Sequence, residues 1–141
     1  MRQLYLTVAV PKMAYAAEVW YTLPHKTDPL HTKRTGSIPF TRSVQAAQRR
    51  AMINMLGAMR TTAGDMLNAY AFIPPPHLLF AKELTRSAMR LVTLPTSHPL
   101  HGPVQHTIKR IPKRHKSPLH ILFTTTKVKP VLYETILPTR R

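Results

Sequence analysis

The sequence predicts a mainly α protein, in which a small bundle of about four helices is followed by a Pro-rich, basic and largely irregular C-terminal arm. Three observations support this prediction. Apolar residues recur at helical spacing in four segments before residue 95. Hydrophobic residues make up 43% of the chain, as in folded domains. Most of the 14 prolines lie after Leu94 or in short clusters, which predicts a helical domain over 1–95 and an arm over 96–141.

The first predicted helix spans residues 4–21 and bends at Pro11, because proline removes a helical hydrogen bond. Helical spacing is shown by Leu6, Val10, Met13 and Ala17. The apolar side, for which core packing is expected, also includes Tyr5, Tyr15, Val19 and Trp20. Residues 24–40 contain Pro, Gly and Lys/Arg without apolar periodicity, so a flexible basic loop is expected there.

The second predicted helix spans residues 41–59, and either Thr41 or Ser43 is a suitable cap. Its expected apolar arc consists of Val44, Ala47, Ala51, Met55, Ala58 and Met59. Arginines are expected together on the opposite side, namely Arg42, Arg49, Arg50 and Arg60. Thr62 and Asp65 then resemble a capping box and predict a short helix through Ala71.

Three prolines, Pro74 to Pro76, interrupt the chain before a fourth predicted helix over 77–93. The expected buried side consists of Leu78, Ala81, Leu84, Ala88, Leu91 and Val92. A basic row repeats every four residues and consists of Lys82, Arg86 and Arg90. This row is either a solvated face or a set of phosphate contacts, and Glu83 is the single acid available to it on this helix.

The predicted arm contains a basic run without an acid, made of Lys109, Arg110, Lys113, Arg114 and Lys116. Two apolar stretches follow, 119–123 and 128–133, which are either short strands or anchors that pack on the helices. Seven prolines after Leu94 argue against any long helix in this part of the chain.

The charge composition predicts a polyanionic partner. The chain has 21 Lys and Arg against 5 Asp and Glu, which gives a net charge of +16. Nucleic acid, an anionic membrane face and an acidic protein all meet this requirement. The absence of cysteine excludes disulfides and zinc ribbons, and it favours an intracellular location in the nucleus or cytoplasm. The longest apolar stretch, Leu4 to Ala17, is too short and too interrupted to span a membrane, so no membrane partner is expected.

Catalytic patterns are missing from the isolated chain. The five acids do not form the close carboxylate arrangement of a two-metal site, and no glycine-rich phosphate loop is present. The eight histidines lack the i, i+4 spacing of a helical metal site. We therefore expect no catalytic residue, no metal site and no cofactor in this segment.

Three phrases in order carry a family resemblance: KMAYAAEVWY from Lys12, AAQRRAMINMLGAMRTTAGDML from Ala46, and RLVTLPTSHPL from Arg90. Together they resemble the region after the palm of reverse transcriptases from non-LTR, LINE-type retrotransposons, especially fungal ones. HKSPLHILF from His115 and YETILP from Tyr133 are similar to the linker that precedes ribonuclease H in such polyproteins. The resemblance covers nearly the whole chain.

The resemblance implies a non-catalytic thumb and connection segment of an RNA-directed DNA polymerase. The family's Tyr-x-Asp-Asp phrase lies upstream of this region, and the chain contains no Asp-Asp pair. The implied partners are an RNA–DNA hybrid or duplex, bound without sequence preference, and the palm and ribonuclease H domains of the parent. The phosphate-contacting residues expected in this role are Arg49, Arg50, Arg60, Lys82, Arg86, Arg90, Lys109, Arg110, Lys113, Arg114 and Lys116.

Two other classes of protein share parts of this pattern. A small basic structural RNA-binding protein of the ribosomal type also combines basic arms with a helical core, and it would bind one folded RNA tightly. A membrane-surface protein would place the basic arm on anionic lipid, but the chain lacks a long basic amphipathic helix with Trp or Phe anchors.

Overall fold

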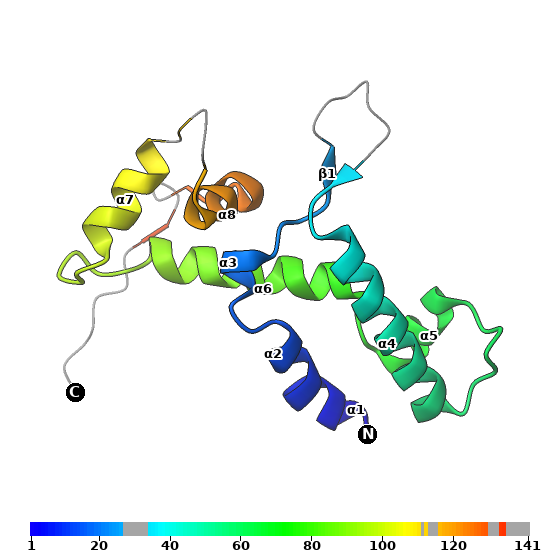
Figure 1. The fold of residues 1–141 in the computed structure, drawn as a ribbon. Coiled ribbons are helices and arrows are strands. Elements are labelled where there is room, and N and C mark those ends of the chain that lie inside the picture. Colours follow the sequence, from blue (N-terminus) through cyan, green and yellow to red (C-terminus); the bar gives the residue numbers. More distant parts are fainter. Residues whose placement is uncertain (27–33, 111, 113–115, 130–132, 135–141) are drawn as a thin grey trace, which may run out of the picture. The chain divides into compact units, whose positions relative to one another are not determined.

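The structure is a computed structural model that describes residues 1–26, 34–110, 112, 116–129 and 133–134 (Figure 1). The described chain is mainly helical, which confirms the predicted fold class. The chain divides into two compact units, each taken by itself below. Unit 1 contains residues 1–15 and 23–80, and unit 2 contains residues 16–22 and 81–141. The division falls inside one helix, whereas the sequence places a boundary near residue 95.

The N-terminal segment of unit 1 is a continuous run of short helices. Helix α1 spans Arg2–Leu4, the π-helical turn η1 spans Tyr5–Ala9, and α2 spans Val10–Met13. Pro11 lies in the first turn of α2, and because η1 runs directly into α2, its missing N–H interrupts the helical hydrogen bonds at this point. The wider π turn directly precedes the proline, where an α-helical carbonyl would meet the ring.

The expected helix over 4–21 is broken at Ala16 and not merely bent at Pro11. Ala16 has φ of 52°, in the left-handed region, and α3 then spans only Ala17–Trp20. The expected core packing of the aromatic side is wrong for Tyr15 and Val19, which are 80% and 61% exposed. The break reorients the chain after Met13, so one apolar stripe cannot continue along the whole segment.

A short antiparallel pair joins the N-terminal segment to the next helix of unit 1. Strand β1 spans His25–Lys26 and β2 spans Arg34–Thr35, with His25 opposite Thr35 and Lys26 opposite Arg34. The expected flexible basic loop falls largely on residues 27–33, which lie outside the described residues.

Helix α4 spans Ile38–Leu56 and begins three residues before the predicted cap. Proline in the first turn favours this earlier start, and the N-cap is Ser37. Thr41 and Ser43 therefore lie inside the helix, where their hydroxyls donate to the carbonyls of Ser37 and Pro39 at 2.8 and 3.1 Å. The helix ends at Gly57, whose φ of 63° suits a residue without a Cβ.

The buried stripe of α4 is rotated from the predicted arc. Its buried residues are Thr41, Val44, Gln48 and Met52, whereas Ala47 is exposed and Met59 is 78% exposed. Apolarity alone did not identify this stripe because one of its members is a polar amide, Gln48, only 1% exposed.

Gln48 is buried because all of its amide groups are paired. Its Oε1 accepts a hydrogen bond from the Tyr5 hydroxyl at 3.0 Å. Its Nε2 donates to Asn68 Oδ1 at 3.1 Å and to the Pro74 carbonyl at 2.9 Å. A buried amide is tolerated when its donors and acceptor are satisfied in this way. One side chain thus connects the N-terminal segment, α4, α5 and the linker after α5.

The hydrophobic core of unit 1 lies between α4 and α5, which pack side by side (Figure 1). Helix α5 spans Gly64–Ala71. The core cluster consists of Met52, Leu67, Ala71 and Ile73. The predicted Thr62–Asp65 capping box is wrong, because the N-cap is Ala63, which has no side chain able to accept the bond.

Helix α6 spans Pro76–Val92, close to the predicted range. Its buried residues recur every four positions and are Pro76, Phe80, Leu84, Ala88 and Val92. The predicted buried side included Leu78, which is 52% exposed. The buried stripe begins with Pro76 and Phe80 in the first turns of α6. Phe80 packs on Phe40, with the ring centroids 5.7 Å apart.

Unit 2 contains two further helices where the sequence predicts an irregular arm. Helix α7 spans His101–Lys109 and α8 spans Pro118–Thr126, and α8 contacts both α3 and α7. The prolines permit these helices because Pro103 and Pro118 lie in the first turns. The residues 119–123, left open between strands and anchors, lie in α8, where Leu122 and Phe123 are buried.

A side-chain box fixes the start of α8. The Ser117 side chain accepts from the backbone N–H of His120, and Ser117 N–H donates to His120 Nδ1 at 3.3 Å. Because a backbone N–H can only donate, Nδ1 must be the unprotonated nitrogen. His120 Nε2 then carries the proton and donates to the Arg110 carbonyl at 3.2 Å. Histidine here takes the place that Glu or Gln has in most such boxes.

Candidate nucleic-acid interface

The predicted cations fall into three groups in the structure. Arg49, Arg50 and Arg60 lie together in unit 1 around one pocket. Lys82, Arg86 and Arg90 lie in unit 2 as an exposed row on α6. Lys109, Arg110 and Lys116 are exposed at the end of α7 and before α8. Lys113 and Arg114 lie outside the described residues.

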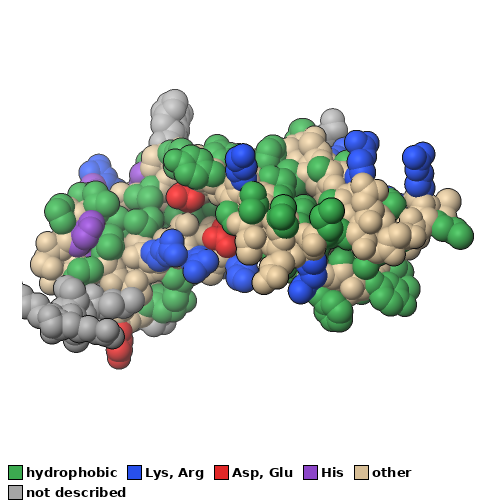
Figure 2. All heavy atoms as spheres, turned by 90° about the horizontal axis from the view of Figure 1, so that it is seen from below, with side chains coloured by type: hydrophobic (Ala, Val, Ile, Leu, Met, Phe, Trp, Pro, Cys, Tyr) green, Lys and Arg blue, Asp and Glu red, His purple; other side chains and the backbone are tan. Residues whose placement is uncertain are grey.

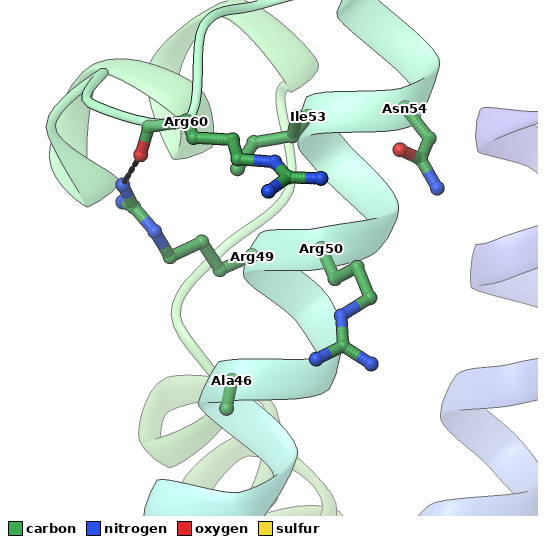
Figure 3. A pocket seen from close by; sticks show the side chains of 6 residues that line it. All are labelled: Ala46, Arg49, Arg50, Ile53, Asn54 and Arg60. Carbon is green, nitrogen blue, oxygen red and sulfur yellow. Dashed lines mark hydrogen bonds between the residues drawn. The ribbon is translucent and has the colours of Figure 1, made fainter.

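The arginine pocket of unit 1 has a volume of about 540 Å³. Its lining residues are Ala46, Arg49, Arg50, Ile53, Asn54 and Arg60 (Figure 3). Five of them recur three or four residues apart on one face of α4. Arg60 was expected on the same helix, but it lies in the loop after α4, because Gly57 ends the helix. The loop nevertheless returns Arg60 to the pocket.

Arg49 has a structural role in the pocket. Its Nη2 donates to the Arg60 carbonyl at 2.8 Å, as the dashed line in Figure 3 shows. A Cβ added at Gly64 would meet Arg49 Nη1 at 3.7 Å, so the guanidinium also lies against the start of α5. Arg49 thus holds the loop that presents Arg60.

Arg50 and Arg60 have exposed side chains that line the same hollow from two directions (Figure 3). No acid is among the lining residues. Across the described ranges, the ion pair of Arg86 with Glu83 is the only one. Arg50 and Arg60 therefore have no carboxylate partner within the described chain, and their charge is available to an anion.

The α6 row stacks along the helix because its members are four residues apart. Arg86 Nη1 lies 4.0 Å from Glu83 Oε1, and both side chains are well exposed, at 59% and 38%. An exposed pair of this kind contributes little free energy, so it does not prevent Arg86 from binding phosphate.

Among the charged side chains visible in Figure 2, Lys and Arg are more prominent than Asp and Glu. Blue Lys and Arg side chains are spread among green hydrophobic ones, with few red acids between them. An excess of cations over acids attracts polyanions.

The sequence did not identify Asn54 as part of this site. Asn54 follows Arg50 by four residues on α4, so the helical spacing was a usable signal. The spacing of cations alone does not indicate a neutral amide, because it carries no charge.

The described residues contain no cluster of three or more His, Asp or Glu side chains that could hold a metal ion. Ser117 Oγ lies 2.5 Å from His120 Nδ1, which brings a hydroxyl and an imidazole together. Both groups belong to the cap of α8, so the contact is explained by helix termination.

None of the helices within the described ranges has the length and apolarity needed to cross a bilayer. Comparison of the chain with protein-family models, with curated proteins and with solved structures finds no match.

Proposed function

We propose that this chain is a thumb and connection segment of a non-LTR retrotransposon reverse transcriptase, and that it holds an RNA–DNA hybrid or duplex by its phosphates. The observation that carries the binding part is the arginine pocket, where Arg50 and Arg60 face one hollow without a carboxylate partner among the described residues. The parent enzyme's catalytic carboxylates belong to other segments.

Phosphate contact, rather than base readout, is the function this site supports best. A polymerase must move over every sequence, so its grip uses groups that all nucleic acids share. An A-form hybrid has a major groove too deep and narrow for side chains to read. Arginines in a shallow hollow, together with the exposed row on α6 and the cations near α7, suit such contacts.

The proposed assignment of the chain to a reverse transcriptase rests on the three ordered sequence phrases that begin at Lys12, Ala46 and Arg90. The test of this part is the genomic DNA on both sides of the reading frame. A Tyr-x-Asp-Asp phrase upstream or a ribonuclease H sequence downstream is the expected finding. Unrelated coding sequence on both sides would overturn the assignment to this family.

The binding part is tested by fluorescence anisotropy with a labelled, blunt RNA–DNA hybrid and the full chain. Affinity should fall steeply between about 50 and 200 mM salt, because each neutralised phosphate releases counterions. Arg50→Gln and Arg60→Gln should each reduce the slope of log K against log salt by about 1. Arg60→Gln keeps the carbonyl to which Arg49 donates, so the loop should stay in place.

Lys12→Gln is the matched control, because it removes the same charge from an exposed position of unit 1 outside the pocket. Its slope should stay close to that of the unchanged chain. Salt-independent binding, or equal slopes for all three variants, would refute the phosphate grip. Tight binding to one folded RNA, with little affinity for duplexes, would favour the ribosomal-type alternative instead.

A further inference from the structure

An apolar groove adjoins the arginine pocket in unit 1. It has a volume of about 300 Å³ and lies between the N-terminal segment and α4. Its apolar lining comes from Met1, Leu4, Tyr5, Ala9, Ala51 and Met55. Met1 and Leu4 are 92% and 64% exposed, so the groove is open to solvent. The arginine pocket and this groove both have volumes within the range of ordinary small-ligand sites, which is about 300–1,000 Å³.

Tyr5 gives this groove an aromatic ring held in one place. Its hydroxyl donates to Gln48 Oε1 at 3.0 Å, and Gln48 is itself fixed by Asn68 and Pro74. An aromatic ring fixed in this way loses little further freedom when a flat ligand stacks on it.

Asn54 connects the two hollows, because it lines both of them. Arg50 lies one turn before Asn54 on α4, and Ala51 and Met55 continue the surface toward the groove. Figure 3 shows the Asn54 side chain extending toward the N-terminal segment, away from Arg49. The Arg50 cation, the Asn54 amide and the groove that contains Tyr5 therefore lie next to one another along one surface of α4.

We propose that this surface binds one unpaired nucleotide of a nucleic-acid strand. The phosphate lies between the guanidinium groups of Arg50 and Arg60. The base enters the groove against Tyr5, and the Asn54 amide offers one acceptor and two donors to the edge of the base. The inference rests on the proposed function, and it adds a preference for a single-stranded end, since paired bases inside a duplex cannot enter the groove.

The order of the chemical groups favours this occupant over an apolar protein segment. A nucleotide has its charge at one end and its flat aromatic surface at the other, as the arginine pocket and the groove have. A purely apolar segment would fill the groove alone and would leave the arginines and the hydrogen-bonding groups of Asn54 without a partner. Stacking accepts every base, so the site keeps the sequence tolerance of the duplex grip.

Three labelled hybrids test the proposal by anisotropy with the full chain: one blunt, one with a short single-stranded overhang, and one whose overhang is abasic. The normal overhang should bind about 5- to 100-fold more tightly than the abasic one, as expected for stacking of a base on an aromatic side chain. The abasic strand keeps the added phosphates, so this ratio isolates the base.

Two variants of exposed residues locate the effect. Asn54→Ala and Leu4→Ser should each reduce the preference for the normal overhang at least several-fold, and Leu4→Ser, which lies outside the arginine pocket, should leave blunt-hybrid affinity unchanged. Gln45→Ala is the control, because Gln45 is exposed on α4 and lines neither hollow. Circular dichroism of each variant checks that the helices are retained.

The outcomes separate the two proposals. Salt-dependent binding of the blunt hybrid with equal affinity for normal and abasic overhangs would overturn the nucleotide site and leave the phosphate grip standing. Absence of binding to any of the three hybrids would overturn the proposed function. A self-associated chain that Leu4→Ser converts to monomer, with no overhang preference, would assign the groove to a second copy and overturn the nucleotide site.

Discussion

Replacing Gln48 by methionine would remove a buried amide while keeping a side chain of similar length. The change eliminates three hydrogen bonds, from the Tyr5 hydroxyl and to Asn68 and the Pro74 carbonyl. Each such bond contributes about 0.5–1.5 kcal/mol to stability. The partners are themselves half-buried or exposed, so water replaces part of the loss. We therefore expect Gln48→Met to lower the free energy of unfolding by about 2 kcal/mol.

Urea denaturation of the full chain, followed by far-ultraviolet circular dichroism, measures this change. Gln45→Met is the matched control, since Gln45 is exposed on the same helix and should change stability by less than about 0.5 kcal/mol. If Gln48→Met lowered the free energy of unfolding no more than Gln45→Met does, the hydrogen bonds of Gln48 would not stabilise the contact between the four segments.

Four further changes test the fold. Burial raises the pKa of the Tyr5 phenol above 10.0, so the folded chain retains the proton longer than the unfolded chain, and stability falls as pH rises past that value. The stability difference between the unchanged chain and Tyr5→Phe should therefore shrink above pH 10.0, and a constant difference would contradict this reasoning. Gly57→Ala should lower the free energy of unfolding by about 1–2 kcal/mol, because φ at this position is 63°, in the left-handed region. The cost is one of backbone strain alone, since no atom lies within 4 Å of the added Cβ. Gly102→Ala, in the first turn of α7 and equally free of clashes, should instead stabilise by about 0.4–1 kcal/mol in thermal unfolding. Ser117→Ala removes the α8 cap and should lower the free energy of unfolding, measured by urea denaturation, by about 1 kcal/mol. Ser43→Ala, an exposed change inside α4, should lower it by less than half as much.

The positions of α4 and α6 could be predicted from the sequence because apolar spacing indicated both, and the prolines at 74–76 marked the start of α6. Helix α5 was located by the Thr62–Asp65 pattern, although that pattern forms no cap. The faces that they bury could not be predicted equally well. Gln48 is polar, and only its three partners, distant in sequence, make its burial favourable. The break at Ala16 had no local signal, because alanine is the strongest helix former and its Cβ disfavours the left-handed region.

The candidate site shows the same limit. Arg49 and Arg50 line one pocket because they are neighbours on α4, a relation that the sequence alone indicates. Arg60 joins them by a different route, through a loop held by Arg49. The apolar groove depends on the N-terminal segment lying across α4, which is a tertiary contact without a pattern in the sequence. The helices α7 and α8 were missed because prolines were read as helix breakers, although a first-turn proline favours helix initiation.

The Gln48 connection has a consequence for the evolution of this chain. Glutamate at position 48 would lose both donors, and asparagine would lack the length to reach three partners on separate segments. The residues at positions 5, 48 and 68 therefore depend on one another, and a change at one of them leaves its partners without a hydrogen bond. In related chains we expect them to covary, with Tyr, Gln and Asn retained together or replaced together by an apolar set that needs no hydrogen bonds.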